Sequence, residues 1–278
     1  MIAVARRVLT FALLATVWNA AVSAATLQPT DDPAASPIWQ KVRASVFQNR
    51  VITPAPPGLL SLEAPARAID AAVVPISIRM QAAQTPTRFV SKLYLVIDAN
   101  PSPVSAIFGL TAESGRVGIE TRVRVDDYSH VRVIAEMNDG QLFATTRFVK
   151  ASGGCSAPAG SDAQAALASM GKMRVRVEGD LSGREPVRAE LLINHPNHSG
   201  LAMDQTTRQF TPAHFVRKVN VSFAGKPVFS ADVDFSISEN PNFRFYFQPN
   251  GPGSLKVMAS DSQNREFEHV EALRASIP

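Results

Sequence analysis

Cysteine is almost absent from this chain of 278 residues, which contains Cys155 alone. A single cysteine cannot form an internal disulfide, so a small fold held together by disulfides is excluded. In an exported protein, a cysteine left without a partner is either a reactive thiol or the site of an intermolecular disulfide. Cys155 is therefore the first candidate functional residue.

Other chemical signatures are also missing. The chain has no basic run and no ladder of aromatic residues of the kind that binds nucleic acid. It has no glycine loop for phosphate, no serine nucleophile motif and no pair of catalytic carboxylates. We therefore expect no nucleic-acid partner, no cofactor and no independent enzyme, with no catalytic residue to name.

The N-terminus has the order of a secretory signal peptide over residues 1–24. Arg6 and Arg7 precede an apolar run that is too short for a good membrane-spanning helix, and small residues end at Ala24. A structural helix is the alternative. Removal of the two arginines leaves 26 basic against 24 acidic residues, a net charge of +2. The sequence thus predicts an exported protein with no membrane association after cleavage, which leaves by the Sec route or, through the adjacent arginines, by the twin-arginine route.

After an unstructured leader over residues 25–36, one short helix is predicted. Ser36 stands at the capping position, Pro37 at the first helical position, and apolar residues follow at near-helical spacing up to Phe47. A hydrophobic content of 45% and a charged content of 19% are typical of a globular protein, and the length is enough for two domains.

Beyond this helix, apolar and polar residues alternate with a period of two. In the run over 117–125, Ile119, Val123 and Val125 share one face, opposite Glu120, Arg122 and Arg124. The run over 130–137 likewise places valines on one face and Arg132 on the other, which predicts half-buried strands. The sequence "NDG" at 138–140 predicts a hairpin turn, and Gly225-Lys226 predicts another.

These patterns predict an all-β protein of two immunoglobulin-like antiparallel β-sandwich domains. The first domain covers residues 37–152 and the second covers 172–278, with Phe243, Phe245 and Phe247 alternating in the latter. A Gly/Ala/Ser-rich linker over 153–171 joins them. Within it, Ser161 and Gln164 have the spacing of a capping box before "AALAS", which permits a short helix.

The surroundings of Cys155 indicate display rather than burial. The stretch "VKASGGCSAPAGSDAQ" places the thiol between Gly153-Gly154 and Ser156-Ala157, among small residues that follow a strand-like run. Glycine adds no side chain to a narrow channel and is conformationally free. With the ordinary thiol pKa of about 8.5, little thiolate is present at neutral pH. This suits a tether that is loaded by another protein's active site.

The histidines provide weak candidates for chemistry. His195 and His198 have Pro196 between them, and no cluster of cysteines or carboxylates completes a metal site, so no metal is predicted. His214 opens a strand and is expected to be structural. A Cys-His active site assembled in space from Cys155 with His130, His195 or His214 stays an alternative.

The second domain resembles the Z subunit of the sulfur-oxidation carrier SoxYZ. The resemblance is carried by "VRAELLINHP", "SGL", "TPAHFVRKVNVSFAGKPVF" and "SENPNFRFYF". The first domain is similar to the Y subunit, more loosely, through "APARAIDAAVVPISI", "LYLVIDANPSPVSAIF" and the "GGC" at its end. The whole chain resembles the fused SoxYZ-like carriers that are associated with quinoprotein dehydrogenases.

The resemblance implies a periplasmic carrier that holds sulfur intermediates such as thiosulfate on a cysteine in a Gly-Gly-Cys-Gly-Gly arm. Gly153, Gly154 and Cys155 match that arm, whereas Ser156 and Ala157 replace its last two glycines. We therefore expect Cys155 to be a covalent carrier site, with Gly153 and Gly154 giving the arm flexibility. The implied partners are sulfur-oxidation proteins or a quinoprotein dehydrogenase and its cytochrome c. Cys155 also permits a disulfide dimer.

A different class of function stays open. The chain is then a docking module for a quinoprotein dehydrogenase or its cytochrome, with Cys155 incidental. Replacement of Cys155 by serine separates the two, because a docking role survives that change.

Overall fold

The computed structural model describes residue 28 and residues 32–158, 163–204 and 207–274. The predicted signal peptide, and the leader except for Gln28 and residues 32–36, lie outside the described residues. Within that leader, Pro33–Ala35 forms a short 3-10 helix, η1, whose first turn is capped by Asp32.

The chain folds almost entirely into strands, as the alternating sequence predicts. Two α-helices are described, α1 (Pro37–Val42) and α2 (Ala163–Ser169), with the short helices η2 (Arg43–Phe47) and η3 (Ala112–Ser114). The strands are β1 (Ile52–Pro54), β2 (Leu60–Glu63), β3 (Val74–Met80), β4 (Val90–Ile97), β5 (Val104–Leu110), β6 (Val117–Val123), β7 (Ser129–Met137), β8 (Leu142–Val149), β9 (Met173–Glu178), β10 (Val187–Ile193), β11 (Val216–Phe223), β12 (Lys226–Val233), β13 (Asn242–Phe247), β14 (Gly253–Asp261) and β15 (Glu266–Leu273).

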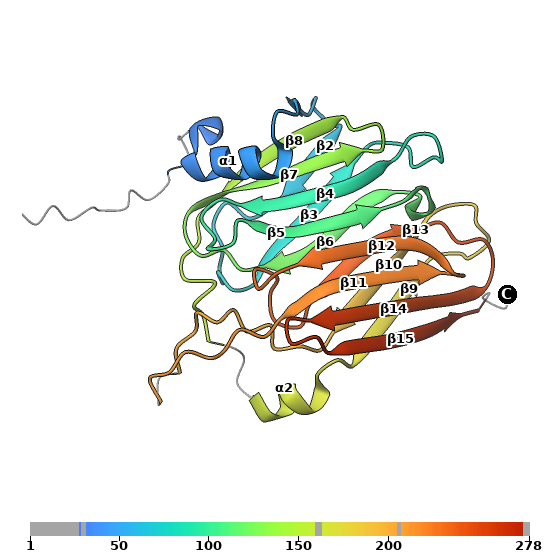
Figure 1. The fold of residues 1–278 in the computed structure, drawn as a ribbon. Coiled ribbons are helices and arrows are strands. Elements are labelled where there is room, and N and C mark those ends of the chain that lie inside the picture. The colour runs from blue at the N-terminus through green and yellow to red at the C-terminus, as the bar shows by residue number, and fades with distance from the viewer. Residues whose placement is uncertain (1–27, 29–31, 159–162, 205–206, 275–278) are drawn as a thin grey trace, which may run out of the picture.

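The strands form two layers that both run through the whole molecule (Figure 1). One sheet has nine strands in the order β1-β8-β7-β4-β5-β12-β11-β14-β15, and the other has six in the order β2-β3-β6-β13-β10-β9. The neighbours are antiparallel except for β1 with β8. The predicted all-β fold of two sandwich domains is confirmed. The domains are also joined edge to edge in both layers.

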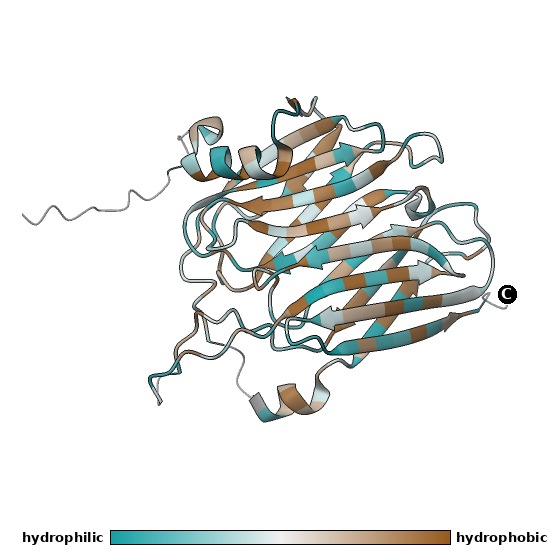
Figure 2. Cartoon of the chain, viewed as in Figure 1, coloured by the Kyte–Doolittle hydropathy of each residue, from teal (hydrophilic) through white to brown (hydrophobic). Residues whose placement is uncertain are grey.

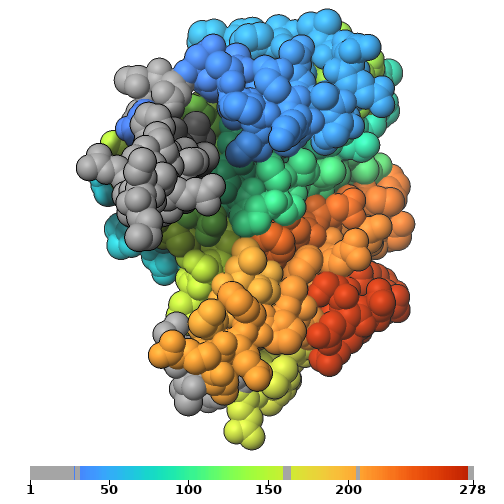
Figure 3. Space-filling view, turned by 60° about the vertical axis from the view of Figure 1, so that its left-hand side comes forward, coloured from blue at the N-terminus to red at the C-terminus, as the bar shows by residue number. Residues whose placement is uncertain are grey.

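In the nine-stranded sheet, the two domains meet through β5 and β12. Five residue pairs form this ladder, from Leu110 with Phe229 to Ala106 with Val233. We call this junction the wide seam. In the space-filling view, the blue-to-green first half meets the orange-to-red second half along a boundary across the molecule (Figure 3).

In the six-stranded sheet, the junction is much shorter. Between β6 and β13, Glu120 pairs with Arg244, and an isolated bridge joins Val123 to Ile237. We call this junction the narrow seam. The strand ladder is therefore longer in the nine-stranded sheet, whereas single backbone bonds, such as the one from the Ser238 N–H to the Arg122 carbonyl at 3.0 Å, complete the junction in the six-stranded sheet.

An aromatic cluster fills the space between the layers at the seams. Phe108 of β5 and Phe229 of β12 have ring centroids 6.1 Å apart, and Phe229 stacks on Phe245 of β13 at 4.5 Å. All of these rings are buried. Such pairs add roughly 0.5–1.5 kcal/mol each beyond the burial of their area. Hydrophobic and hydrophilic segments alternate along the strands (Figure 2), as expected for a core on one face.

Strand β7 differs from its prediction because both of its faces are buried. Val131 and Val133 lie in the core between the sheets, but Arg132 on the opposite face is buried too. Its guanidinium pairs with Asp98 at 2.6 Å and lies over the ring of Trp39. The half-buried prediction is wrong here, because α1 covers this outer face.

The predicted helix after the leader is confirmed, with Ser36 as its cap. The Ser36 hydroxyl accepts a hydrogen bond from the backbone N–H of Trp39, and Pro37 begins α1. The chain continues as one π-helical turn, η2, to Phe47. No helix among the described residues is long and apolar enough to cross a membrane.

The predicted hairpin at 138–140 is also confirmed. Gly140 has a φ of +88° in the turn between β7 and β8, a conformation that favours glycine. Helix α2 lies within the predicted linker, so that segment is partly ordered. The capping serine expected for this helix, Ser161, lies outside the described residues. The predicted domain boundaries themselves stay predictions.

Candidate functional site

Cys155 is buried at the junction of the two domains. Its relative exposure is 0%, and its backbone is held from both sides. The Cys155 N–H donates to Oδ1 of Asp126 at 3.1 Å, and the Ser199 hydroxyl of the second domain donates to the Cys155 carbonyl at 2.5 Å. The prediction of a displayed thiol is therefore wrong for this conformation. An intermolecular disulfide has no accessible sulfur here.

The two glycines before Cys155 allow close packing instead of a loose arm. Gly153 has a φ of +73°, and its N–H donates to the Asp126 carbonyl at 2.6 Å. The Gly154 N–H donates to the Val125 carbonyl at 3.1 Å. A Cβ atom at Gly154 would overlap the carbonyl oxygens of Ala71 and Val125. In this conformation the glycines dock the segment against the first domain, and the flexibility expected of the arm stays a prediction.

A buried arginine that the sequence placed on a solvent face belongs to the same junction. Arg124 follows β6 and has a relative exposure of only 4%. Its Nη2 donates to the Asn197 carbonyl at 3.0 Å, and its backbone N–H donates to the Ser236 carbonyl at 2.7 Å. Its Nε and Nη1 atoms have no hydrogen-bond partner among the described residues. The second domain covers this side chain. The alternation of residues along β6 does not predict this burial.

The charges around the thiol keep it protonated. Burial, helped by the carboxylates of Asp126 and Asp234 and opposed by Arg124, raises the pKa of Cys155 to about 12. The strongest of these charges come from two aspartates and an arginine, not from a histidine. Burial also lowers the pKa of Arg124, against the effect of Cys155. A thiol with so little thiolate is a poor nucleophile, so the Cys-His enzyme hypothesis gains no support here.

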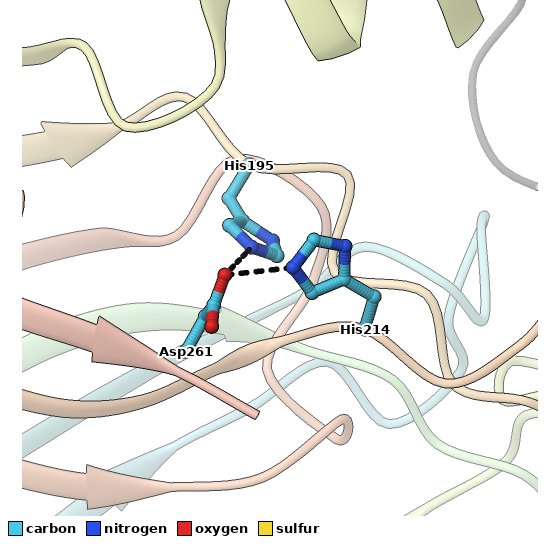
Figure 4. Close-up of side chains that lie close together, drawn as sticks. All are labelled: His195, His214 and Asp261. Carbon is cyan, nitrogen blue, oxygen red and sulfur yellow. Dashed lines mark hydrogen bonds and ion pairs between the residues drawn. The ribbon is translucent and has the colours of Figure 1, made fainter. Parts of the chain in front are cut away.

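The histidines that were candidate bases lie in other contacts. His130 on β7 packs edge-on against Phe148 in the first domain. His195 and His214 meet each other and Asp261 in the second domain, as Figure 4 shows. His214 Nε2 lies 2.7 Å from Asp261 Oδ2, and His195 Nε2 lies 3.6 Å from the same oxygen. His195 therefore pairs with His214 and Asp261 rather than with His198.

Two imidazoles and a carboxylate that converge in this way suggest a metal centre, but the tautomer of His195 does not suit one. His195 Nδ1 accepts a hydrogen bond from the Asn197 N–H at 3.0 Å, so its proton is on Nε2, toward Asp261. A metal-bound histidine normally donates its second ring N–H to a neighbour. The trio is therefore better described as a buried structural cluster, in which His214 is hydrogen-bonded to Asp261 and His195 packs against both.

The electrostatics of this cluster favour a neutral His195 beside a charged Asp261. Burial and the neighbouring His214 lower the pKa of His195 to about 4. Burial alone would raise the pKa of Asp261, but hydrogen bonds from His214 and from the backbone N–H groups of Arg265 and Gln263 bring it below its usual value. The cluster also holds Asn197, the residue whose carbonyl accepts from Arg124.

Two open grooves lie over the seams, and neither includes Cys155. One groove, of about 730 Å³, lies over the six-stranded sheet and is lined by both domains, including Arg122 and Arg244. A second, of about 520 Å³, lies over the nine-stranded sheet and includes Ser102 and Asp234. Cys155 lines neither groove, so the thiol is not presented to solvent through them.

Family models match both halves of the chain. Residues 43–155 match the model described as "Sulfur oxidation protein SoxY", and residues 175–272 match the one described as "Sulphur oxidation protein SoxZ". The first match ends at Cys155. A search of curated proteins found no relative of this chain.

Solved structures give weaker likenesses. The sulfur carrier protein SoxY from Chlorobium limicola f thiosulfatophilum is 20% identical, with a TM-score of 0.34, over 40% of this chain and 94% of that one. The BSP domain of a biofilm associated protein is 7% identical, with a TM-score of 0.24, over 79% of this chain and 30% of that one. A glycosyl hydrolase family 2 member from Bacteroides cellulosilyticus is 10% identical, with a TM-score of 0.22, over 76% of this chain and 28% of that one.

Proposed function

Since this chain is a SoxY domain fused to a SoxZ domain, we propose that it is a sulfur carrier that holds a covalent intermediate on Cys155. The protein presents this cargo to redox enzymes of sulfur oxidation and does not itself catalyse the conversions. The proposal assigns the covalent bond to the chain's one thiol and the recognition of partners to its two sandwiches.

One observation carries this proposal. The SoxY match ends on Cys155, which is the only cysteine of the chain and lies at the junction with the SoxZ domain. Ser199 of the second domain contacts the Cys155 backbone directly, so both domains contribute to the site.

The loading step must release two electrons. If thiosulfate is the cargo, the Cys155 thiol and thiosulfate form the S–S bond of a cysteine S-thiosulfonate, and one proton and two electrons leave. The electrons go to a redox partner with a haem or quinone group. This requirement fits the predicted partners of the cytochrome c or quinoprotein dehydrogenase type, and it places the chemistry on the partner.

Loading also requires the Cys155 segment to leave its position. With its pKa near 12, the buried thiol has almost no thiolate at neutral pH. Three backbone N–H bonds, from Gly153, Gly154 and Cys155, and the Ser199 hydroxyl hold the segment. Each is worth about 1 kcal/mol net, so transient opening is accessible at ordinary temperature. The closed state then protects the cargo between partners.

The predicted cell compartment is the periplasm, where a signal peptide over residues 1–24 would deliver the protein. An oxidising compartment suits a lone thiol that exchanges sulfur species with exported redox enzymes. The identity of the dehydrogenase or cytochrome stays a prediction from the resemblance.

Tetrathionate tests the carrier role without an added oxidant. The Cys155 thiol attacks a central sulfur, releases thiosulfate and a proton, and becomes the S-thiosulfonate. We expect intact-mass spectrometry of the native protein to show one reducible adduct that maps to the Cys155 peptide. The Cys155→Ser variant should show none. A native protein that stays unmodified, while the same chain reacts in denaturant, would refute the proposal.

A docking module is the second candidate, and the charged groove of about 730 Å³ that spans both domains favours it. In that case the cysteine is a packing residue. The Cys155→Ser variant would then still bind the redox partners and still support the sulfur-dependent activity of the reconstituted system. If the protein is a carrier, the variant loses that activity.

A further inference from the structure

An incompletely satisfied cation lies beside the carrier cysteine. Arg124 is buried, and a guanidinium keeps its charge in proteins. Only Nη2 of its side chain has an acceptor, the Asn197 carbonyl. Nε carries one N–H and Nη1 carries two, and none has a partner among the described residues. Buried donors in folded proteins are nearly always satisfied, so a buried set of three indicates a missing acceptor.

Backbone hydrogen bonds bring the segments that carry Arg124 and Cys155 side by side. Gly154, next to the cysteine, bonds to the carbonyl of Val125, next to the arginine. On the other side, Arg124 bonds to Asn197, and Ser199 bonds to Cys155. One short loop of the second domain, from Asn197 to Ser199, therefore contacts both segments. Their charges interact, because each moves the other's pKa toward its charged form.

The carboxylates of this region do not replace the missing acceptor. Asp126 bonds to the backbone of Cys155, and Asp234 Oδ1 accepts from the backbone of Ser236. Glu239 and Asp70 raise the pKa of Arg124, but no hydrogen bond joins either to Nε or Nη1. An anion with several oxygen atoms is the group that these donors lack.

We propose that Arg124 is the anion-binding residue of the carrier site and receives the terminal oxoanion group of a cargo bound to Cys155. The inference rests on the proposed carrier function and narrows its substrate class. A cysteine S-thiosulfonate ends in a sulfonate with three acceptor oxygens and one negative charge. The Nε–H and Nη1–H donors bind that sulfonate and hold the loaded segment closed. A neutral cargo offers no such contact.

The test compares two adducts in two proteins. Tetrathionate gives Cys155 the anionic thiosulfonate. Methyl methanethiosulfonate gives it a neutral methylthio group and releases methanesulfinate. After removal of excess reagent, the loss of each adduct to dithiothreitol at neutral pH is followed by intact mass, for the native chain and for Arg124→Gln.

We expect Arg124→Gln to speed the loss of the thiosulfonate adduct about tenfold or more, as suits a charged hydrogen bond, and to leave the methylthio adduct unchanged. The matched control is Arg122→Gln, two residues earlier in the chain, whose Nη2 donates to the Asn240 carbonyl, and it should change neither rate. Arg124→Lys should restore part of the difference, because it keeps the charge. Equal acceleration of both adducts would assign Arg124 a structural role only and overturn the inference.

Thermal melting of the native chain tests the same inference without relying on a variant that folds. If Arg124 binds the sulfonate, the thiosulfonate-loaded protein melts at a higher temperature than the methylthio-loaded protein. An equal or lower melting temperature contradicts the inference. The carrier function fails separately, if neither reagent modifies Cys155 in the native protein.

Discussion

The two seams between the domains are built in different ways. At the wide seam, five consecutive backbone pairs join β5 to β12 over a buried cluster of phenylalanines. At the narrow seam, strand pairing is limited to Glu120 with Arg244 and to the bridge of Val123 with Ile237. The cysteine segment lies beside the narrow seam. One layer therefore joins the domains by a continuous ladder, and the other joins them by single bonds beside the cysteine segment.

Side-chain hydrogen bonds supplement the short ladder at the narrow seam. The Asn100 amide nitrogen donates to the Arg124 carbonyl at 2.9 Å and to the Ser236 hydroxyl at 3.0 Å. The Arg124 guanidinium donates across the domains to the Asn197 carbonyl at 3.0 Å. Water can replace such hydrogen bonds at a small net cost in free energy. Exposure of a buried phenylalanine to water costs much more. We therefore expect stability to depend on the wide seam and cysteine access to depend on the narrow one.

The largest effect should come from Phe229→Ala, which breaks the wide seam. The side chain is 2% exposed and packs on Phe108, Phe243 and Phe245. We expect a loss of about 3–5 kcal/mol in the free energy of unfolding, measured in urea. The exposed Phe210→Ala is the control and should change little. If only the second domain of this variant unfolds more easily, while the first domain keeps its native stability, the two domains do not share one core.

The second-largest effect should come from acid, which lowers the free energy of unfolding through His195 near the narrow seam. His195 holds the loop that contains Asn197 and stays neutral when folded, with its pKa lowered from 6.5 to about 4. Between these pH values the unfolded chain binds a proton that the folded chain does not, so stability falls as the pH falls. The loss by pH 4 is about 3 kcal/mol.

Urea unfolding at several pH values measures this slope. His195→Asn retains an acceptor near the position of Nδ1 and should remove most of the slope. The control His269→Gln, a partly exposed histidine on β15, should keep it. An unchanged slope in His195→Asn would show that another group is responsible.

Gly154→Ala should open the narrow seam without damage to the wide one. The added Cβ overlaps the carbonyl oxygens of Ala71 and Val125, so the segment cannot dock in its present position. We expect the alkylation of Cys155 by iodoacetamide at pH 8 to rise about tenfold to a hundredfold. The midpoint of urea unfolding should move little. The exposed Ser156→Ala is the matched control, and equal rates in the two variants would contradict the docked geometry.

Ser199→Ala should give the smallest change. It removes one hydrogen bond across the domains, from the Ser199 hydroxyl to the Cys155 carbonyl. A bond of about 1 kcal/mol corresponds to an alkylation rate about fivefold higher. The same assay measures it, and a rate below that of the native chain would show that this contact does not close the site.

Local patterns in the sequence were enough to predict much of the fold. Alternation identified the core face of β6 through Ile119, Val123 and Val125, and the serine before Pro37 marked the start of α1. The glycine at 140 marked a hairpin turn. Each of these signals acts over a few residues, where backbone geometry alone decides the outcome.

The errors arose where distant segments decide burial. Arg124 alternates as a surface residue, yet a loop more than seventy residues later covers it. Cys155 has the neighbours of a displayed thiol, but Asp126 and Ser199 enclose it. The shared sheets follow from strands of one domain that pair with strands of the other. No local period contains that information.

The most direct test of the carrier role is the intact mass of the mature protein taken from its own cells without reductant, with the Cys155 peptide mapped. The account predicts a reducible sulfur adduct on that peptide when the cells oxidise sulfur compounds, with an oxoanion terminus in the mass. A bare thiol under every growth condition would contradict the account.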